Sequence, residues 1–134
     1  MIRASAIVLL LLLPFTWVVA LPSGAGWLEW PLPGGLPLGN LFAAMTMASW
    51  PAASGLLATP RSAARRFASL ALLSAFAWLP ASALLAGNLA LNFSGERGTA
   101  WFALTLAVLA AGVISLAWSA LHRLRQPKAK PASG

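Results

Sequence analysis

Side chains that carry chemistry are scarce in this sequence. It has no cysteine and no tyrosine, a single histidine, and only two acidic residues, Glu29 and Glu96. The absence of cysteine excludes disulfides and thiolate metal sites. His122 has no second donor beside it with which to hold a metal or haem, and its place at a predicted helix end favours an interfacial cap. We therefore expect no catalytic residue, no metal and no cofactor.

Charge is also scarce, whereas apolar residues come in long runs. Of the 134 residues, 60% are hydrophobic and 8% are charged, and the mean hydropathy is +0.81. A soluble domain has about 25% charged residues, and a helix that spans a bilayer needs ~20 apolar residues. The sequence therefore predicts an all-α, polytopic integral membrane protein. It forms a single membrane domain over residues 1–134, with four transmembrane helices at about 4–21, 41–59, 67–91 and 99–121.

None of these four blocks contains Asp, Glu, Lys, Arg or His. An ionisable group inside a bilayer is costly and is kept for a function. Proton pumps, small cation antiporters and intramembrane proteases that use a carboxylate pair depend on such groups. The absence of ionisable residues from the apolar blocks argues against all three classes. It also makes a membrane enzyme the least favoured interpretation.

The first block has two interpretations. Arg3 and the small residues at 18–20 resemble a signal peptide, in which case cleavage would leave three transmembrane helices. The length of the apolar run, the bulk of Trp17 and the position of Pro22 favour an uncleaved anchor and four helices.

The segment 22–40 is rich in proline and glycine, which predicts a loop rather than a helix. It is nevertheless apolar, and Trp27 and Trp30 lie on either side of Glu29. Indole rings favour the level of the lipid headgroups, so we expect an interfacial loop rather than a ligand lid. Trp101 and Trp118 are expected near the two interfaces in the same way, and Asn40 is expected to cap the second helix.

Basic residues flank the apolar blocks, as topology determinants do. They form one cluster between the second and third blocks and another after the fourth: Arg61, Arg65 and Arg66, then Arg123, Arg125, Lys128 and Lys130. We expect both termini in the cytoplasm and a disordered basic tail over 122–134. Setting topology is favoured over binding anionic lipid, and the positions of the charges argue against nucleic acid as a partner.

Small residues recur at every fourth position in the later blocks and predict faces for close helix packing. The residues are Ala103, Ala107, Ala111, Ser115 and Ser119 in the fourth block and Ala44, Ala48 and Ala52 in the second. We expect the last three helices to form the bundle and the bulky first helix to lie at its edge. Pro51 and Pro80 are expected to kink their helices and to leave room for a small polar cavity.

The sequence therefore favours a non-enzymatic accessory or assembly subunit that packs against other membrane proteins. The alternative is a small transporter or channel for a neutral or apolar solute, for which a homo-oligomer is one possible form. The expected partners are the lipid bilayer and either a membrane protein or further copies of the chain. The composition, dominated by Ala, Leu, Arg, Gly and Pro, is typical of a GC-rich bacterial genome and predicts a multi-pass protein of the inner (plasma) membrane.

Overall fold

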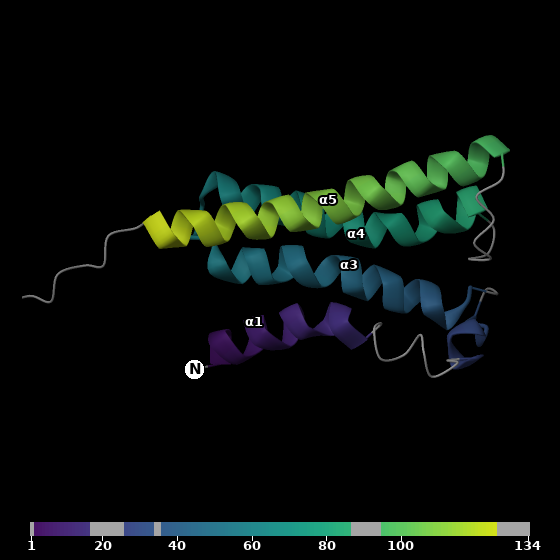
Figure 1. The fold of residues 1–134 in the computed structure, drawn as a ribbon, viewed down its shortest axis with the longest axis horizontal. Coiled ribbons are helices and arrows are strands. Elements are labelled where there is room, and N and C mark those ends of the chain that lie inside the picture. Colours follow the sequence, from purple (N-terminus) through teal and green to yellow (C-terminus); the bar gives the residue numbers. More distant parts are fainter. Residues whose placement is uncertain (1, 17–25, 34–35, 87–94, 126–134) are drawn as a thin grey trace, which may run out of the picture.

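The computed structural model describes residues 2–16, 26–33, 36–86 and 95–125. Four α-helices make up most of this part of the chain (Figure 1): α1 (Ile2–Leu12), α3 (Leu38–Leu57), α4 (Ala63–Ala86) and α5 (Gly95–Arg125). Two short 3-10 helices, η1 (Leu13–Phe15) and η2 (Gly26–Glu29), follow α1. The prediction of an all-α chain with four helices is confirmed.

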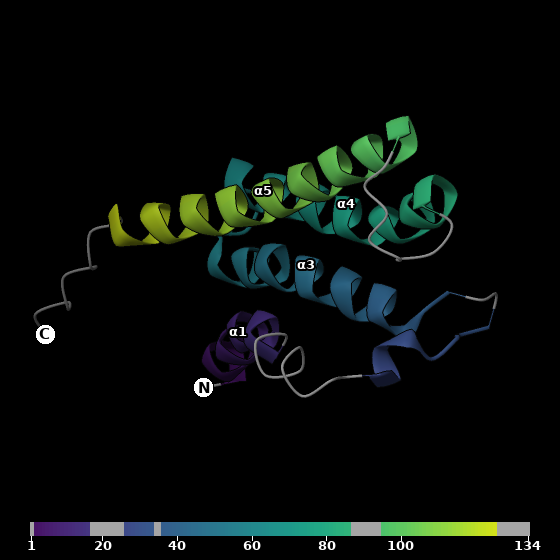
Figure 2. The same cartoon turned by 45° about the vertical axis from the view of Figure 1, so that its right-hand side comes forward.

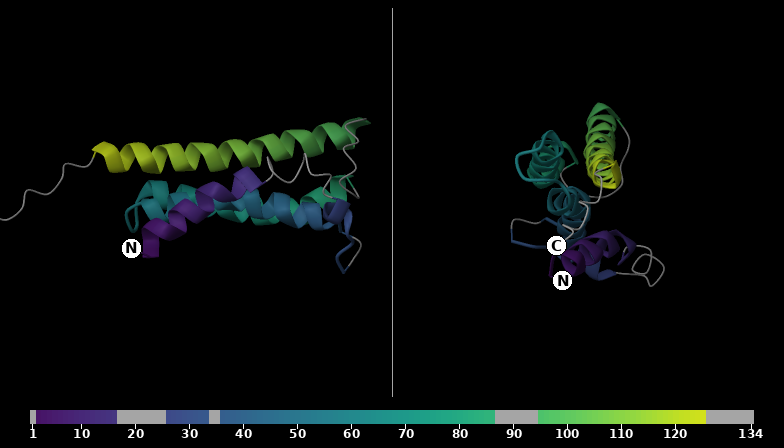
Figure 3. Two further views of the ribbon diagram at one scale, coloured as in Figure 1. Left: turned by 60° about the horizontal axis from the view of Figure 1, so that its bottom comes forward. Right: turned by 90° about the vertical axis from the view of Figure 1, so that its left-hand side faces the viewer.

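The helices alternate in direction along the chain, so that consecutive helices are antiparallel (Figures 1 and 2). Helices α3, α4 and α5 each pack against the other two, while α1 packs chiefly against α3. Viewed along the bundle, α1 lies on the side of α3 away from α4 and α5 (Figure 3). The last three helices therefore form the bundle and the first lies at its edge, as the distribution of small residues predicted.

Two of the helices are long and apolar enough to cross a membrane, namely α4 over Ala63–Leu85 and α5 over its whole length. The apolar run in α1, Arg3–Phe15, is shorter. Helix α3 is 20 residues long but carries Asn40, Thr46 and two buried serines. It is not one of the two helices that are apolar enough to cross a membrane. Residues 17–21 and 87–91 of the predicted spans lie outside the described residues.

The helix ends differ from those predicted. Helix α3 starts after Pro37, whose backbone is extended, so Asn40 lies inside the helix and does not cap it. Helix α5 is 31 residues long and includes Glu96 in its first turn, whereas the predicted fourth span begins at about residue 99. An acid at the start of a helix and cations at its end complement the helix dipole, which explains why α5 extends beyond its apolar block in both directions.

The last turn of α5 contains His122, Arg123 and Arg125. These residues are helical, which corrects the prediction of a disordered tail starting at residue 122. The remainder of that tail, including Lys128 and Lys130, lies outside the described residues.

Buried positions in the bundle follow a regular spacing. On α4 they alternate between four and three residues. The same series occurs on α3, which also buries Gly39, Ala48, Ser49 and Ala53, and on α5 from Trp101 onward the steps are seven, four, three and four. Such spacing keeps a side chain on one face of a helix over many turns. The positions are Asn40, Ala44, Met47, Pro51, Ser54 and Ala58 on and just after α3; Ala64, Ala68, Ala71, Ala75, Trp78 and Ser82 on α4; and Trp101, Val108, Gly112, Ser115 and Ser119 on α5. Most of these residues are small, so the helix backbones approach closely.

Helix α5 packs closely against α3 at Gly112. A Cβ atom at this position would lie 3.4 Å from Cδ of Pro51 and 3.6 Å from the carbonyl oxygen of Met47. Pro51 and Pro80 both lie inside helices, where each removes one amide donor. In α3 the carbonyl that loses its donor is that of Met47, and it lies beside Gly112.

We expect Gly112→Leu to lower the free energy of unfolding by about 1–3 kcal/mol, because the seam, the contact between α3 and α5, has no room for four more carbons. Gly112→Ala should be neutral or slightly stabilising, because the added methyl makes ordinary contacts and alanine favours the helix by up to about 1 kcal/mol. Thermal unfolding in mild detergent would measure both.

The matched control is Gly55→Leu on α3, because a Cβ atom at Gly55 would have no neighbour within 4 Å. If the leucine variants of Gly112 and Gly55 unfold at the same temperature, the close approach at Gly112 does not limit the packing of α5 against α3.

Candidate functional site

Three buried serines connect α3 to α5. The hydroxyl of Ser54 donates to the carbonyl oxygen of Ser115 at 2.8 Å and lies 2.7 Å from the hydroxyl of Ser119. A serine has one O–H donor, so Ser119 must be the donor to Ser54. Ser115 in turn donates to the carbonyl of Gly112 at 2.9 Å. The cluster therefore satisfies its own donors and acts as a polar clamp between two helices.

Two tryptophans connect α4 to α5. The indole N–H of Trp78 donates to Thr105 at 2.9 Å, and that of Trp101 donates to Ser82 at 2.6 Å. Thr105 donates to the carbonyl of Trp101 at 2.8 Å, and the two rings lie 6.2 Å apart at 50°. Each indole is thus supplied with an acceptor from the opposite helix.

The two tryptophans of α5 lie in different environments. Trp101 is 8% exposed, and its N–H reaches across to Ser82 on α4. Trp118 is 44% exposed, and its ring lies 5.8 Å from that of Phe67. Their placement near the two membrane interfaces stays a prediction.

The chemistry available in the described interior is limited to hydroxyls, indoles and one amide. A serine becomes a nucleophile when a neighbouring base takes its proton. In the described part of the chain the groups that could do so, Glu29, Glu96 and His122, are all exposed, and no three potential metal ligands lie together. The buried polar groups are therefore arranged to hold helices together.

Two grooves run beside these contacts. The larger, of about 290 Å³, lies between α4 and α5 and is lined mainly by alanines together with Ser74, Trp78, Leu104 and Val108. The smaller, of about 200 Å³, lies among α3, α4 and α5 beside Thr46, Met47 and Thr105. Pockets for small ligands usually measure about 300–1,000 Å³, so both grooves are below that range.

The predicted small-residue stripe on α5 divides between two environments. Ser115 and Ser119 are buried in the seam, Ala111 is half-buried, and Ala103 and Ala107 are exposed. A step of four residues advances about 40° beyond a full turn of a helix, so the stripe winds out of the seam and into the larger groove, which Ala107 and Ala111 line. On α3, Ala44 and Ala48 are buried and Ala52 is half-buried.

The predicted interfacial loop is packed onto the start of α3. Trp27 and Phe42 meet edge to face with ring centroids 5.2 Å apart. The amide of Leu38 donates to the carbonyl of Trp30 at 2.9 Å, although the Trp30 side chain is 66% exposed. Any larger residue at Gly39 would crowd this contact, because a Cβ atom would lie 3.2 Å from the carbonyl oxygen of Leu28.

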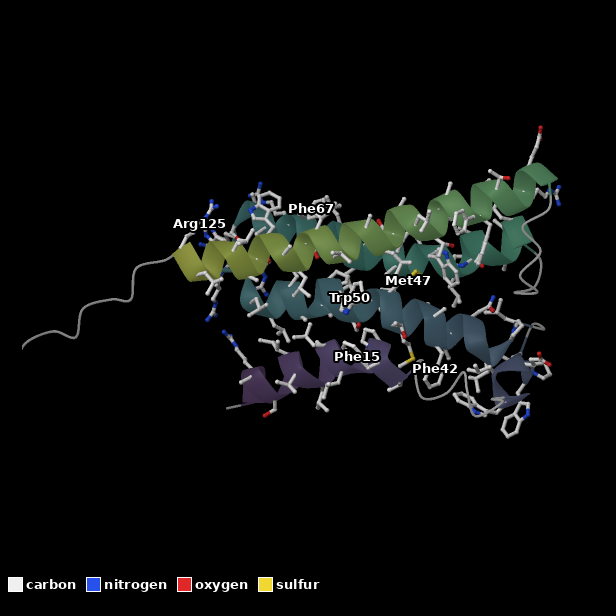
Figure 4. The ribbon with its side chains drawn as sticks, in the orientation of Figure 1. Phe15, Phe42, Met47, Trp50, Phe67 and Arg125 are labelled. Atoms are coloured by element: carbon white, nitrogen blue, oxygen red, sulfur yellow. The ribbon has the colours of Figure 1, made fainter. Side chains whose placement is uncertain are left out.

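The charged residues are segregated along the bundle (Figure 4). The start of α1, the α3–α4 connection and the end of α5 lie at one end, which therefore holds Arg3, Arg61, Arg65, Arg66, Arg123 and Arg125. Glu29, Glu96 and Arg97 lie at the opposite end. The two predicted basic clusters, as far as they are described, therefore lie at the same end of the bundle.

Several residues that shape the interior were not singled out from the sequence. They include Ser54, Trp78, Ser82 and Thr105, and the alternating spacing of four and three would have pointed to most of them. Asn40 is also buried, at 1% exposure, and its side-chain oxygen has no hydrogen-bond partner. Comparisons of the chain with protein-family models, with curated proteins and with solved structures found no match.

We expect Ser82→Ala to destabilise the bundle by about 1–3 kcal/mol, because the buried indole N–H of Trp101 loses an acceptor. Adding Trp101→Phe should recover part of the Ser82→Ala loss, since the unpaired donor is then removed. Unfolding of the single and double variants in mild detergent gives the coupling energy.

Ser74→Ala is the control, because Ser74 is exposed and its hydroxyl only donates to the carbonyl of Leu70 within its own helix. A Ser82→Ala variant as stable as Ser74→Ala would show that the indole contact contributes nothing to the α4–α5 packing.

Proposed function

We propose that this chain is a non-enzymatic membrane subunit that packs laterally against another membrane protein. The observation that carries the proposal is the alanine-lined groove between α4 and α5, which includes Ala77 and Ala81 on one wall and Ala107 and Ala111 on the other. Small residues on both walls would let the backbone of a further helix approach closely. The groove is thus suited to a transmembrane helix of a partner.

The exposed surface around the groove supports this proposal. Only 28% of the apolar span of α4 and 22% of that of α5 are buried within the chain. Leu73 on α4 and Leu106 on α5 are among the large side chains left exposed, at 64% and 49%. A surface of this kind requires lipid or protein around it.

The second candidate is a small transporter or channel for a neutral or apolar solute. The smaller groove favours it in one respect, because the side chains of Trp78, Trp101 and Thr105 line it. Its volume of about 200 Å³ and the engagement of these groups with one another argue against it. A partner-binding role needs neither a solute site nor a titratable group, so it accounts for more of the chain.

For location we propose a bacterial inner membrane, with the arginine-rich end of the bundle in the cytoplasm. Lys and Arg in short loops are retained on the cytoplasmic side. The two helices long enough to span, α4 and α5, start and end respectively at this arginine-rich end.

We expect Ala107→Leu combined with Ala111→Leu to release the partner while leaving the chain folded, because Ala107 is exposed and Ala111 only half-buried. The wild-type chain, extracted in mild detergent from its native membrane, should run in a complex heavier than its own 13.9 kDa. In native mass analysis the double variant should appear as the free chain.

Ala110→Leu provides a matched control, because Ala110 is an exposed alanine of the same helix that does not line the groove. If the double variant keeps the wild-type complex, or if Ala110→Leu disrupts it equally, the groove is not the contact surface. A defined homo-oligomer that conducts solute in liposomes would favour the second candidate.

The proposed orientation predicts the side of each connection. A fluorescent protein fused after Gly134 should be fluorescent, because it folds in the cytoplasm, and alkaline phosphatase inserted at Ser94 should be active, because it folds outside. The opposite pattern would reverse the orientation without affecting the proposal about the groove.

A further inference from the structure

Five arginines from two parts of the chain meet at one end of the bundle. Arg61 lies in the turn between α3 and α4, Arg65 and Arg66 lie in the first turn of α4, and Arg123 and Arg125 lie in the last turn of α5. We call these five residues the basic end. Figures 1 and 2 show the connection between α3 and α4 and the last turn of α5 at the same end of the bundle.

Specific contacts hold the two contributions together. Arg123 donates from Nε to the carbonyl oxygen of Leu57, the last residue of α3, at 3.0 Å. This bond leaves the two terminal nitrogens of its guanidinium for other acceptors. One residue beyond Arg66, the ring of Phe67 lies 5.8 Å from that of Trp118 on α5. The end of α5 is therefore fixed beside the α3–α4 turn.

Arg61, Arg65 and Arg66 lie at positions where the backbone does not favour arginine. Arg61 has a φ of 62°, a conformation that suits glycine better than a residue with a side chain. Arg65 and Arg66 place positive charge at the start of α4, where the helix dipole favours an anion and where the first turn contains no acid. Helix α5 follows the opposite and favourable pattern, with Glu96 at its start and arginines at its end.

The basic end has no carboxylate of its own. Both acidic residues of the chain, Glu29 and Glu96, lie at the opposite end of the bundle. Guanidinium groups that gather without a counter-ion repel one another and attract an external anion, and their planar forks match phosphate oxygens in pairs. The half-exposed indole of Trp118 marks the level of the lipid headgroups at the same end.

We propose that the basic end binds the phosphate of an anionic phospholipid. A lipid is favoured over a soluble anion because the arginines directly adjoin the ends of the two long apolar helices, against which acyl chains would lie. The inference needs the membrane placement of these helices but not the partner-binding groove, so the two proposals can fail separately.

The test uses the purified full-length chain in a neutral detergent, titrated with phosphatidylglycerol, with phosphatidylcholine or with inorganic phosphate. Bound lipid is counted by native mass spectrometry. We expect phosphatidylglycerol to bind and phosphatidylcholine to bind far more weakly. Arg65→Gln with Arg66→Gln, and separately Arg123→Gln with Arg125→Gln, should weaken binding of phosphatidylglycerol roughly tenfold or more. The corresponding lysine variants, which keep the charge but lose the fork, should bind more tightly than the glutamine variants.

Arg97→Gln is the matched control, because it removes an arginine from the opposite end, beside Glu96, and should leave lipid binding unchanged. Equal binding of the two lipids, or equal loss in the glutamine and lysine variants, would overturn the proposal, the second because it indicates structural damage rather than lost charge. Displacement of phosphatidylglycerol by millimolar inorganic phosphate would also overturn it in favour of a soluble anion.

Discussion

The bundle depends on how closely α5 approaches α3 at Gly112 and Pro51. This contact has room for a methyl group but not for a larger side chain, because a Cβ atom at Gly112 would already lie 3.4 Å from the proline ring. The approach brings the hydroxyl of Ser54 within hydrogen-bond distance of Ser115 and Ser119. Packing at small residues and the buried hydroxyl bonds are therefore one interaction, because neither forms at the larger helix separation that bulky side chains would impose.

The interior has the contacts that the proposed membrane location would require. Burial of apolar surface contributes little there, because lipid is as apolar as a protein core, so specificity has to come from close packing and hydrogen bonds. Along α5 these bonds occur at two levels, with indole bonds to α4 toward its start and serine bonds to α3 toward its end. The groups that make these bonds are neutral at every ordinary pH, so no titratable side chain takes part in the helix contacts of the described residues.

The helical class, the number of helices and the edge position of α1 could be predicted because long apolar runs and small-residue content are properties of single segments. The buried face of α5 could not be predicted by a fixed step of four, since such a stripe rotates around the helix and carries Ala107 out of the seam. The burial of Trp101 depends on Ser82 of another helix, and contacts between segments leave little trace in either one alone. Asn40 was misplaced because Pro37, and not the asparagine, sets the start of α3.

The segregation of charge also bears on how such a chain would be inserted during synthesis. In the proposed orientation, α4 and α5 cross the membrane as one helical hairpin. At the end that crosses first, the start of α5 carries Glu96 beside Arg97, and the two charges nearly cancel. The connection that precedes α3 contains a single acid, Glu29, and no cation. Both clusters of basic residues would stay in the cytoplasm, on the side of the ribosome. Only three ionised side chains, Glu29, Glu96 and Arg97, would then have to cross the membrane, so insertion can proceed two helices at a time.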